Sequence, residues 1–233
     1  MYECHHLDEY LRTARIDESL PLSTGGGHSD KRRLILEGNV VAVAKPDLGG
    51  TSSAQIRSEV AACLLARELG WADLVPATVL RSAVELEPGG RVADCSVQVA
   101  WATFRTAFDI PKQAVDCVPS EAWRVAVFDV LIRNSDRKPD NWGQIGDSDV
   151  VRLFDHGNAH VPPPRGGFSS DFFECYKGQD IPEELLRALV GFTTQRDQRG
   201  TRLDEVLDPA AVDAVFHRAQ RLVEDRTLAA PQE

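Results

Sequence analysis

The loop Asn134-Ser135-Asp136-Arg137-Lys138-Pro139-Asp140-Asn141 and the later tetrapeptide Phe154-Asp155-His156-Gly157 carry most of the information in this 233-residue chain. In the loop an Asp is followed by an Asn five positions on, and a second Asp stands fourteen residues after that Asn. Carboxylate and amide oxygens are ligands of the hard divalent cations. The two segments are joined by a stretch short enough for a hairpin, so we expect them to meet at one site.

The order of these residues also predicts a reaction. In a kinase active site, a loop Asp accepts the proton of the attacking hydroxyl, and an Asn and a later Asp hold the cations on the phosphates. We therefore predict that Asp136 is catalytic and that Asn141 and Asp155 bind magnesium. Arg137 or Lys138 would offset charge that develops on the transferred phosphoryl group. An Asp- and Asn-rich turn without catalytic function is the alternative.

Two upstream residues fit the same chemistry. Val41–Lys45 reads as an apolar strand that ends in a lysine, as does the kinase strand whose lysine contacts the nucleotide phosphates. Thr51–Leu69 is predicted to be a helix, and Glu59 lies within it. A helix carboxylate at this place would pair with Lys45 and orient it toward the phosphates. Glu68 competes for that role but stands near the predicted helix end.

A glycine-rich segment precedes the first of the strands expected before Lys45. Its backbone N–H groups would approach the phosphates of a nucleotide, although a plain loop is the alternative reading. The glycines predicted to bind the cofactor are Gly25, Gly26 and Gly27. Three basic residues that follow would add positive charge there: Lys31, Arg32 and Arg33.

The pattern of apolar residues predicts a two-part architecture. The first hundred residues read as β-rich with one helix, after a short amphipathic leader at 1–20. The strands expected there are Leu34–Leu36, Val40–Ala44, Val75–Leu80 and Val97–Trp101. The second half reads as helical, with helices predicted at Ser120–Ile132, Pro182–Phe192 and Pro209–Thr227. The predicted fold class is α+β and two-lobed, with an N-lobe at 1–100 and a C-lobe at 101–233. If Gln98–Trp101 joins the lobes, Gln98 would contact the adenine.

Composition excludes several classes of protein. The formal net charge is −10, which argues against a nucleic acid as partner. No apolar run approaches the roughly 20 residues of a membrane span. The five cysteines are odd in number and contain no Cys-x-x-Cys motif, which favours a reducing compartment over a disulfide framework. We therefore expect a cytoplasmic enzyme.

Taken together, the segment Leu22–Lys45, Glu59, the loop Asn134–Asn141 and Asp155-His156-Gly157 resemble the HipA-like kinases. These kinases are relatives of the phosphatidylinositol 3- and 4-kinases. The order Asp136-Arg137 is similar to those families and opposite to the Arg-Asp order of ordinary protein kinases. The resemblance implies a protein-kinase-like fold, ATP and Mg²⁺ as cofactors, and transfer of the γ-phosphoryl group to a serine of a protein substrate.

The resemblance leaves other functions open. The chain is much shorter than full-length HipA, which puts a toxin role and an antitoxin or operon partner in doubt. A lipid or small-molecule kinase, an AMP transferase on the same fold and a nucleotide-binding pseudokinase are the alternatives. In the HipA-like family a serine of the glycine-rich loop can be phosphorylated by the kinase itself. Here that serine would be Ser23 or Ser29.

Overall fold

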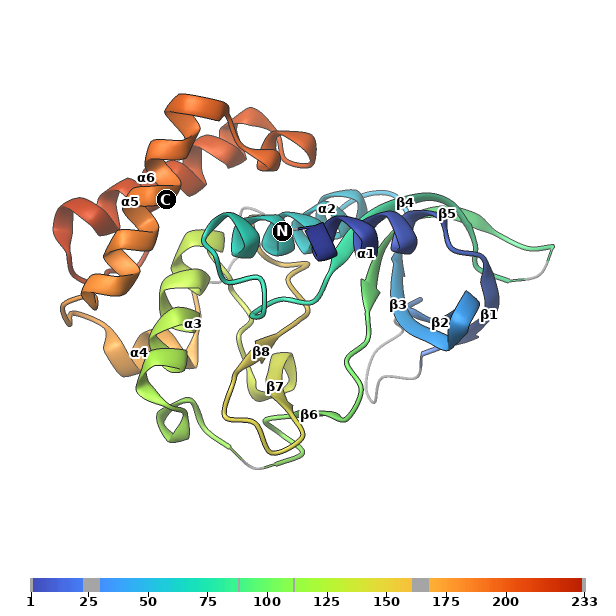
Figure 1. Cartoon of the computed structure of the whole chain (residues 1–233), viewed down its shortest axis with the longest axis horizontal. Coiled ribbons are helices and arrows are strands. Elements are labelled where there is room, and N and C mark those ends of the chain that lie inside the picture. Colours follow the sequence, from blue (N-terminus) through green and yellow to red (C-terminus); the bar gives the residue numbers. More distant parts are fainter. Residues whose placement is uncertain (1, 23–29, 88, 111, 161–167, 232–233) are drawn as a thin grey trace.

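The computed structural model describes residues 2–22, 30–87, 89–110, 112–160 and 168–231. Its strands form a larger and a smaller sheet, and the larger sheet lies at one end of the molecule with helices α3 to α6 at the other (Figure 1). The elements in chain order are α1 (Tyr2–Thr13), β1 (Ile16–Pro21), β2 (Arg32–Leu36), the one-turn helix η1 (Glu37–Asn39), β3 (Val40–Pro46), α2 (Ser52–Glu68), β4 (Thr78–Glu85), β5 (Val92–Val99), β6 (Phe104–Thr106), η2 (Ala114–Asp116), α3 (Pro119–Ile132), η3 (Pro139–Asn141), β7 (Trp142–Ile145), β8 (Arg152–Leu153), α4 (Asp171–Tyr176), α5 (Glu183–Arg199), η4 (Arg202–Glu205) and α6 (Pro209–Asp225).

The larger sheet has the strand order β1-β2-β3-β5-β4, and its neighbouring strands are antiparallel. On β3, Ala42 and Ala44 are fully buried and belong to one hydrophobic cluster with Leu11 and Ala14 at the end of α1. Successive side chains of a strand point to opposite faces. The side chain of Lys45 therefore projects from the opposite face of the sheet, which α1 does not cover.

Helix α2 follows β3 through a tight turn. Gly49 and Gly50 have φ angles of 87° and 62°, which lie in the left-handed region that glycine adopts without steric cost. All residues from 58 to 66 are buried, so the helix packs between the sheet and the rest of the chain instead of exposing one face. The helix predicted at Thr51–Leu69 is confirmed to within one residue at each end.

The N-terminal prediction is partly wrong. Residues 1–20 were expected to form a single amphipathic leader, but α1 ends at Thr13 and the chain continues as the edge strand β1. Leu20 of β1 lies opposite Arg33 of β2. Ile16 and Ser19 are half-buried and the other four residues are exposed, and three of the six side chains are polar, so the sequence carries little of the apolar pattern that identifies a strand.

The strand boundaries predicted in the middle of the N-terminal half are also displaced. Strands β4 and β5 are each eight residues long and pair with one another, whereas we expected two shorter strands at Val75–Leu80 and Val97–Trp101. Arg81 and Asp94 lie within these strands. An antiparallel sheet tolerates polar residues where one face meets solvent, so an apolar run marks only part of each strand.

Helix α3 positions the loop at 134–141. It is buried along most of its length, as predicted for Ser120–Ile132, and it ends at Arg133, whose φ of 52° is left-handed. The loop then leads into the smaller sheet, which has the order β6-β7-β8. At Gly143 of β7 a Cβ atom would lie 2.0 Å from the backbone oxygen of Arg105 on β6. The close approach of these two strands therefore requires glycine.

The helical half has a hydrophobic core of its own, to which α2 also contributes. The side chains of Trp142 and Phe172 are fully buried and meet edge to face at 4.8 Å between ring centroids. The segment from 100 to 103 connects β5 to β6 and so joins the two halves. The predicted division at residue 100 lies in this connection, and it stays a prediction.

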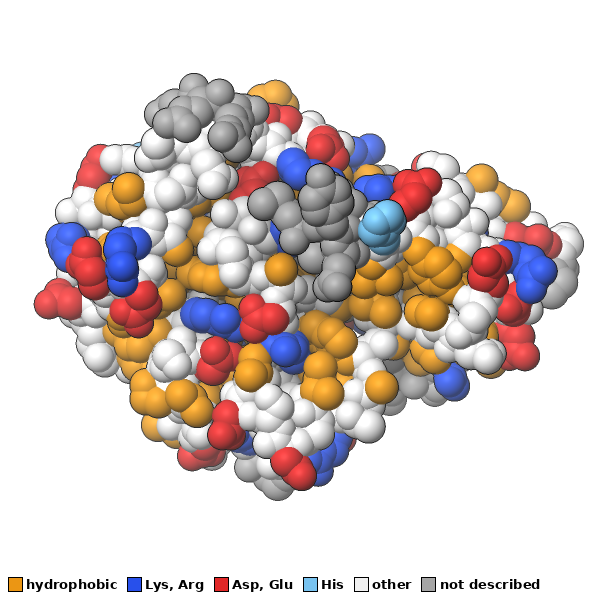
Figure 2. Space-filling view, in the orientation of Figure 1, with side chains coloured by type: hydrophobic (Ala, Val, Ile, Leu, Met, Phe, Trp, Pro, Cys, Tyr) orange, Lys and Arg blue, Asp and Glu red, His pale blue; other side chains and the backbone are white. Residues whose placement is uncertain are grey.

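On the face drawn in Figure 2, acidic and basic side chains are interspersed, and those of the described residues form no continuous basic surface there. Among the described residues, no helix has both the length and the apolar composition needed to cross a membrane.

Candidate active site

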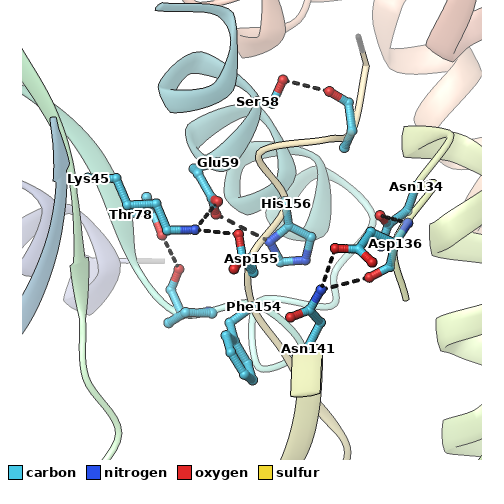
Figure 3. A network of polar contacts seen from close by, with 12 residues as sticks. Lys45, Ser58, Glu59, Thr78, Asn134, Asp136, Asn141, Phe154, Asp155 and His156 are labelled. Atoms are coloured by element: carbon cyan, nitrogen blue, oxygen red, sulfur yellow. Dashed lines mark hydrogen bonds and ion pairs between the residues drawn. The ribbon is translucent and has the colours of Figure 1, made fainter. Parts of the chain in front are cut away.

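Three charged residues from distant parts of the chain meet beside the larger sheet (Figure 3). Lys45, from the end of β3, forms an ion pair with Glu59 of α2. Its ammonium nitrogen also lies 2.8 Å from Oδ1 of Asp155, which follows β8. The pairing of Lys45 with Glu59 that we predicted is thus present, and Lys45 also contacts Asp155, the predicted metal ligand. The competing Glu68 instead accepts hydrogen bonds from Thr201 and the backbone N–H of Arg202, away from this cluster.

The cluster keeps its groups charged in spite of burial. Burial by itself would raise the pKa of the Glu59 carboxyl, but the Lys45 ammonium beside it holds that pKa below the ordinary value. Burial likewise opposes ionisation of Asp155, and the ammonium groups of Lys45 and Lys31 lower its pKa. In return, Glu59 and Asp155 outweigh the effect of burial on Lys45 and raise its pKa. All three groups are therefore ionised at neutral pH.

A second lysine contacts the same carboxylate. The ammonium nitrogen of Lys31 lies 2.8 Å from Oδ2 of Asp155, so each oxygen of Asp155 has its own lysine partner. Lys31 immediately precedes β2, and Lys31 was expected only to add positive charge near the glycine-rich segment. Its contact with Asp155 spans 124 positions of sequence, which no local pattern could have indicated.

These residues line a cleft of about 290 Å³. Its walls come from the start of β2, the end of β3, the first half of α2 and the residues around Asp155. The lining residues are Asp30, Lys31, Lys45, Pro46, Leu48, Ser52, Gln55, Ile56, Glu59, Asp155, Gly157 and Asn158. Two lysines and three carboxylates in one cleft make it suited to a ligand that carries both an anion and a cation.

The loop at 134–141 places its polar side chains next to this cleft (Figure 3). The side-chain amide nitrogen of Asn141 donates to the backbone oxygen of Asp136 at 2.7 Å and to its Oδ2 at 3.2 Å. The backbone N–H of Asp136 donates to Oδ1 of Asn134, and Lys138 lies 3.2 Å from the Asp136 carboxylate. The Asp136 carboxylate is only partly buried, so one side of it remains open to an incoming group.

Asn141 and Asp155 have a chemistry that fits a divalent cation. The amide nitrogen of Asn141 is occupied by Asp136, which leaves its carbonyl oxygen as the acceptor. Asp155 supplies an ionised carboxylate. Among the described residues, no group of three or more His, Cys, Asp and Glu side chains could hold a metal by itself. A cation here would have two protein ligands and would take its other ligands from phosphate or water, as Mg²⁺ does at substrate phosphates.

The prediction for Arg137 is wrong. We expected its guanidinium to offset phosphoryl charge, but the side chain is fully buried and pairs with Asp129 of α3. It also donates to the backbone oxygens of Asn141 at 2.6 Å and Phe154 at 3.1 Å. A guanidinium with five donors in a rigid fork can join several acceptors at once. Arg137 therefore connects the two motif segments to α3 from beneath, and only Lys138 faces the open side of the loop.

Two further residues of this buried network were not predicted from the sequence, Asp129 and its own partner Ser170. Asp129 is fully buried in α3 and also accepts hydrogen bonds from Asn134 at 3.2 Å and from the Ser170 hydroxyl at 2.7 Å. Ser170 in turn caps α4 by accepting from the N–H of Phe173. A signal for Asp129 was present, because a carboxylate inside an otherwise apolar helix must find a partner when it is buried. Nothing in the sequence marked Ser170 as that partner.

His156 is a packed residue of the site. Its side chain is buried, its Nδ1 lies 3.7 Å from Oε2 of Glu59, and its ring meets Phe128 edge to face. Burial lowers the pKa of its imidazole, so the ring is neutral beside the Glu59 carboxylate. His156 thus supports Glu59 on the side opposite Lys45 and takes no part in the open cleft.

The remaining predicted nucleotide contacts are Gln98 and the glycines at 25–27. Gln98 lies on β5 opposite Val43, on the same face of the sheet as Lys45, and it is partly exposed. Its predicted contact with adenine stays a prediction. The glycines Gly25, Gly26 and Gly27 lie outside the described residues, as do Ser23 and Ser29.

Comparisons with known proteins support the fold. The structure resembles the Golgi casein kinase, with a TM-score of 0.65, 14% sequence identity, and coverage of 96% of this chain and 75% of that one. The same kinase with Mn/ADP bound gives a TM-score of 0.65 at 15% identity over 97% of this chain and 76% of that one. The hydra protein Fam20 with a sugar gives 0.62 at 14% identity over 97% and 89%. No family model and no curated protein matches the sequence.

The two-lobed α+β protein-kinase-like fold is therefore confirmed. At this level of identity the comparisons establish the fold alone. The resemblance to HipA-like kinases remains a prediction, because the structural neighbours reported above are of another kind.

Proposed function

We propose that this protein is an ATP-dependent phosphotransferase that moves the γ-phosphoryl group to a hydroxyl of a protein serine, with Mg²⁺ as cofactor. One observation carries the proposal: Lys45, Glu59 and Asp155 meet in one cleft, and Asp136 and Asn141 contact each other beside it (Figure 3). Phosphoryl transfer uses this set of groups. The kinase-like fold and the neighbour with Mn/ADP bound support a nucleotide and a divalent cation as ligands.

Each residue has a role in the proposed reaction. Asp136 orients the acceptor hydroxyl and accepts its proton as the new bond from oxygen to phosphorus forms. Glu59 holds the ammonium of Lys45, which offsets charge on the nucleotide phosphates. Asn141 and Asp155 would hold the cation, which when bound neutralises charge on the β- and γ-phosphates. The bond between the γ-phosphorus and the bridging oxygen breaks, and ADP leaves.

The proposed acceptor and the proposed location of the protein come from the sequence resemblance and from the cysteines. A protein serine follows from the resemblance to HipA-like kinases, and an antitoxin or operon partner would accompany that reading. We place the protein in the cytoplasm, because Cys63, Cys95, Cys117 and Cys175 are free thiols among the described residues.

The test is incubation of the purified chain and a cell lysate with Mg²⁺ and ATP labelled in either the γ- or the α-phosphate. Asp136→Asn is the inactive variant. Asp140→Asn is the matched control, because Asp140 is an exposed carboxylate in the same loop. We expect γ-label on protein from the parent and the control and none from Asp136→Asn. The Asp155→Ala variant is expected to fold but to lose metal-dependent nucleotide binding.

Other outcomes would replace the proposal with one of its alternatives. Label from the α-phosphate would show AMP transfer, and γ-label in the lipid extract of added phosphoinositide vesicles would show a lipid kinase. Nucleotide binding without label from either position would indicate a pseudokinase. Undiminished affinity of Asp155→Ala for Mg²⁺ and ATP would refute the metal site.

A further inference from the structure

We propose that Lys31 is a phosphate-binding lysine that exchanges partners: it occupies Asp155 while the cleft is empty and moves to a nucleotide phosphate when nucleotide and cation enter together. The inference rests on the proposed function, since it assigns a second cationic residue to the same nucleotide site. It also predicts an order of affinities, in which the cation binds poorly without the nucleotide.

The first step of the argument is the occupancy of Asp155. Lys45 contacts Oδ1 and Lys31 contacts Oδ2, each at 2.8 Å, so both carboxylate oxygens already have a cationic partner. A divalent cation that used Asp155 would have to replace one of them. The side chain of Lys31 is the more exposed of the two, at 26% against 16% for Lys45. Lys31 is therefore the lysine that yields.

The second step is the charge balance of the cleft. Lys31 and Lys45 carry two positive charges, and three carboxylates line the same cleft, those of Asp30, Glu59 and Asp155. A divalent cation added alone at Asp155 would stand beside both ammonium groups that contact this carboxylate, and they would repel it. A nucleotide that enters together with the cation adds more negative charge on its phosphates than the cation adds positive charge, and a displaced ammonium can pair with these phosphates.

The third step is position. Lys31 and Lys45 line the same cleft from two adjacent strands, with Lys31 directly before β2 and Lys45 near the end of β3. A lysine has four rotatable bonds and a compact charge, so its ammonium can move between two acceptors without a change of the backbone. An ammonium that leaves Asp155 therefore still points into the cleft where phosphates would lie.

Linkage makes the proposal measurable. If Lys31 competes with the cation and attracts the phosphates, then nucleotide raises the affinity for the cation, and the cation raises the affinity for the nucleotide by the same factor. Removing the ammonium must change the two affinities in opposite directions: the cation alone binds more tightly, and the nucleotide binds more weakly. A lysine that only stabilised the fold would not produce opposite signs.

The experiment measures free Mn²⁺ by electron paramagnetic resonance during titration of the full chain, with and without ADP, corrected for the Mn²⁺–ADP complex in solution. Lys31→Met is the test variant, Lys31→Arg keeps the charge, and Arg91→Met is the control. Arg91 is exposed and does not line the cleft, so its loss changes the net charge equally without changing the site. Circular dichroism checks that each variant is folded.

We expect Lys31→Met to bind Mn²⁺ alone about tenfold more tightly and ADP with Mn²⁺ about tenfold more weakly, each tenfold being about 1.4 kcal/mol. Lys31→Arg and Arg91→Met should bind both ligands as the parent does. Unchanged affinity of Lys31→Met for Mn²⁺ alone, an unchanged affinity for ADP, or equal effects of Arg91→Met would each overturn the proposal. Lack of Mn²⁺ binding by every chain would overturn it too. If the variants show these changes in affinity but the parent transfers no label from ATP, the exchange of partners by Lys31 is supported and the proposed phosphoryl transfer is refuted.

Discussion

Arg137 offers the sharpest test of how the site is held together. Its guanidinium and the Asp129 carboxylate are both fully buried, with N–O distances between 3.0 and 3.3 Å. The same guanidinium satisfies the backbone oxygens of Asn141 and Phe154. We predict that Arg137→Met destabilises the protein by about 3–5 kcal/mol, because it leaves the buried Asp129 carboxylate without its counter-charge and removes a donor from the carbonyls of Asn141 and Phe154.

A double-mutant cycle isolates the cause of that loss. Asp129→Asn removes the charge but keeps one acceptor oxygen for the Asn134 amide, and its own NH2 group can donate to the Ser170 hydroxyl oxygen. In the double variant with Arg137→Met no unpaired charge remains, so the double variant should be less destabilised than the sum of the single variants by about 2 kcal/mol. The cycle therefore separates the ion pair from the hydrogen bonds to the backbone.

The assay is urea unfolding followed by tryptophan fluorescence and circular dichroism, with the m-value checked to be constant across the variants. Arg15→Met is the control. Its guanidinium lies 2.7 Å from Asp17, but its side chain is 75% exposed, so the control should change the free energy of unfolding by less than about 1 kcal/mol. If Arg137→Met unfolds within about 1 kcal/mol of the parent, or the two substitutions are additive, the reasoning on the buried network is refuted.

Two further predictions concern the site and the sheet beside it. The pKa of Glu59 is lowered in the folded state by Lys45, so the ionised group stabilises the protein at neutral pH, and this stabilisation is lost as the pH falls through the folded-state pKa. The unfolding free energies of the parent and Glu59→Gln, measured from pH 7 to pH 3, should therefore converge as the pH falls. A constant difference between the two free energies would contradict the ion pair. Gly143→Ala should destabilise the protein by about 1–3 kcal/mol, because the new Cβ would collide with the backbone oxygen of Arg105. Gly191→Ala, in α5, should stabilise it by up to about 1 kcal/mol, because a Cβ there would have no atom within 4 Å and alanine favours the helix. Thermal unfolding of both variants measures these changes, and equal effects would show that the strands can separate without cost.

Much of the site was predictable because its signals are local. Asp136, Asn141 and Asp155 lie in two short segments with fixed spacing, and residue type together with spacing is enough to predict ligands and a base. Lys45 ends an apolar strand and Glu59 lies inside a clear helix, so each could be assigned to an element before any contact was known. The structure brings Lys45, Glu59 and Asp155 into one cleft, and Asp136 and Asn141 contact each other beside it.

The order of the elements was largely predictable as well, although their ends were not. The helices α2 and α3 are confirmed because long buried segments have strong apolar patterns. Strand β1 and the full lengths of β4 and β5 were missed. Their stabilisation comes from hydrogen bonds to neighbouring strands, which do not depend on the kind of side chain.

Only the tertiary structure decided which charges share a partner. The sequence alone determined that a kinase-like set of residues is present and in order, because that information is carried by residue type and spacing. It could not determine that Arg137 turns inward to Asp129, or that Lys31 reaches Asp155 across 124 positions. Those pairings depend on the direction of each side chain and on which groups lose water when the two halves pack, and both are properties of the folded chain.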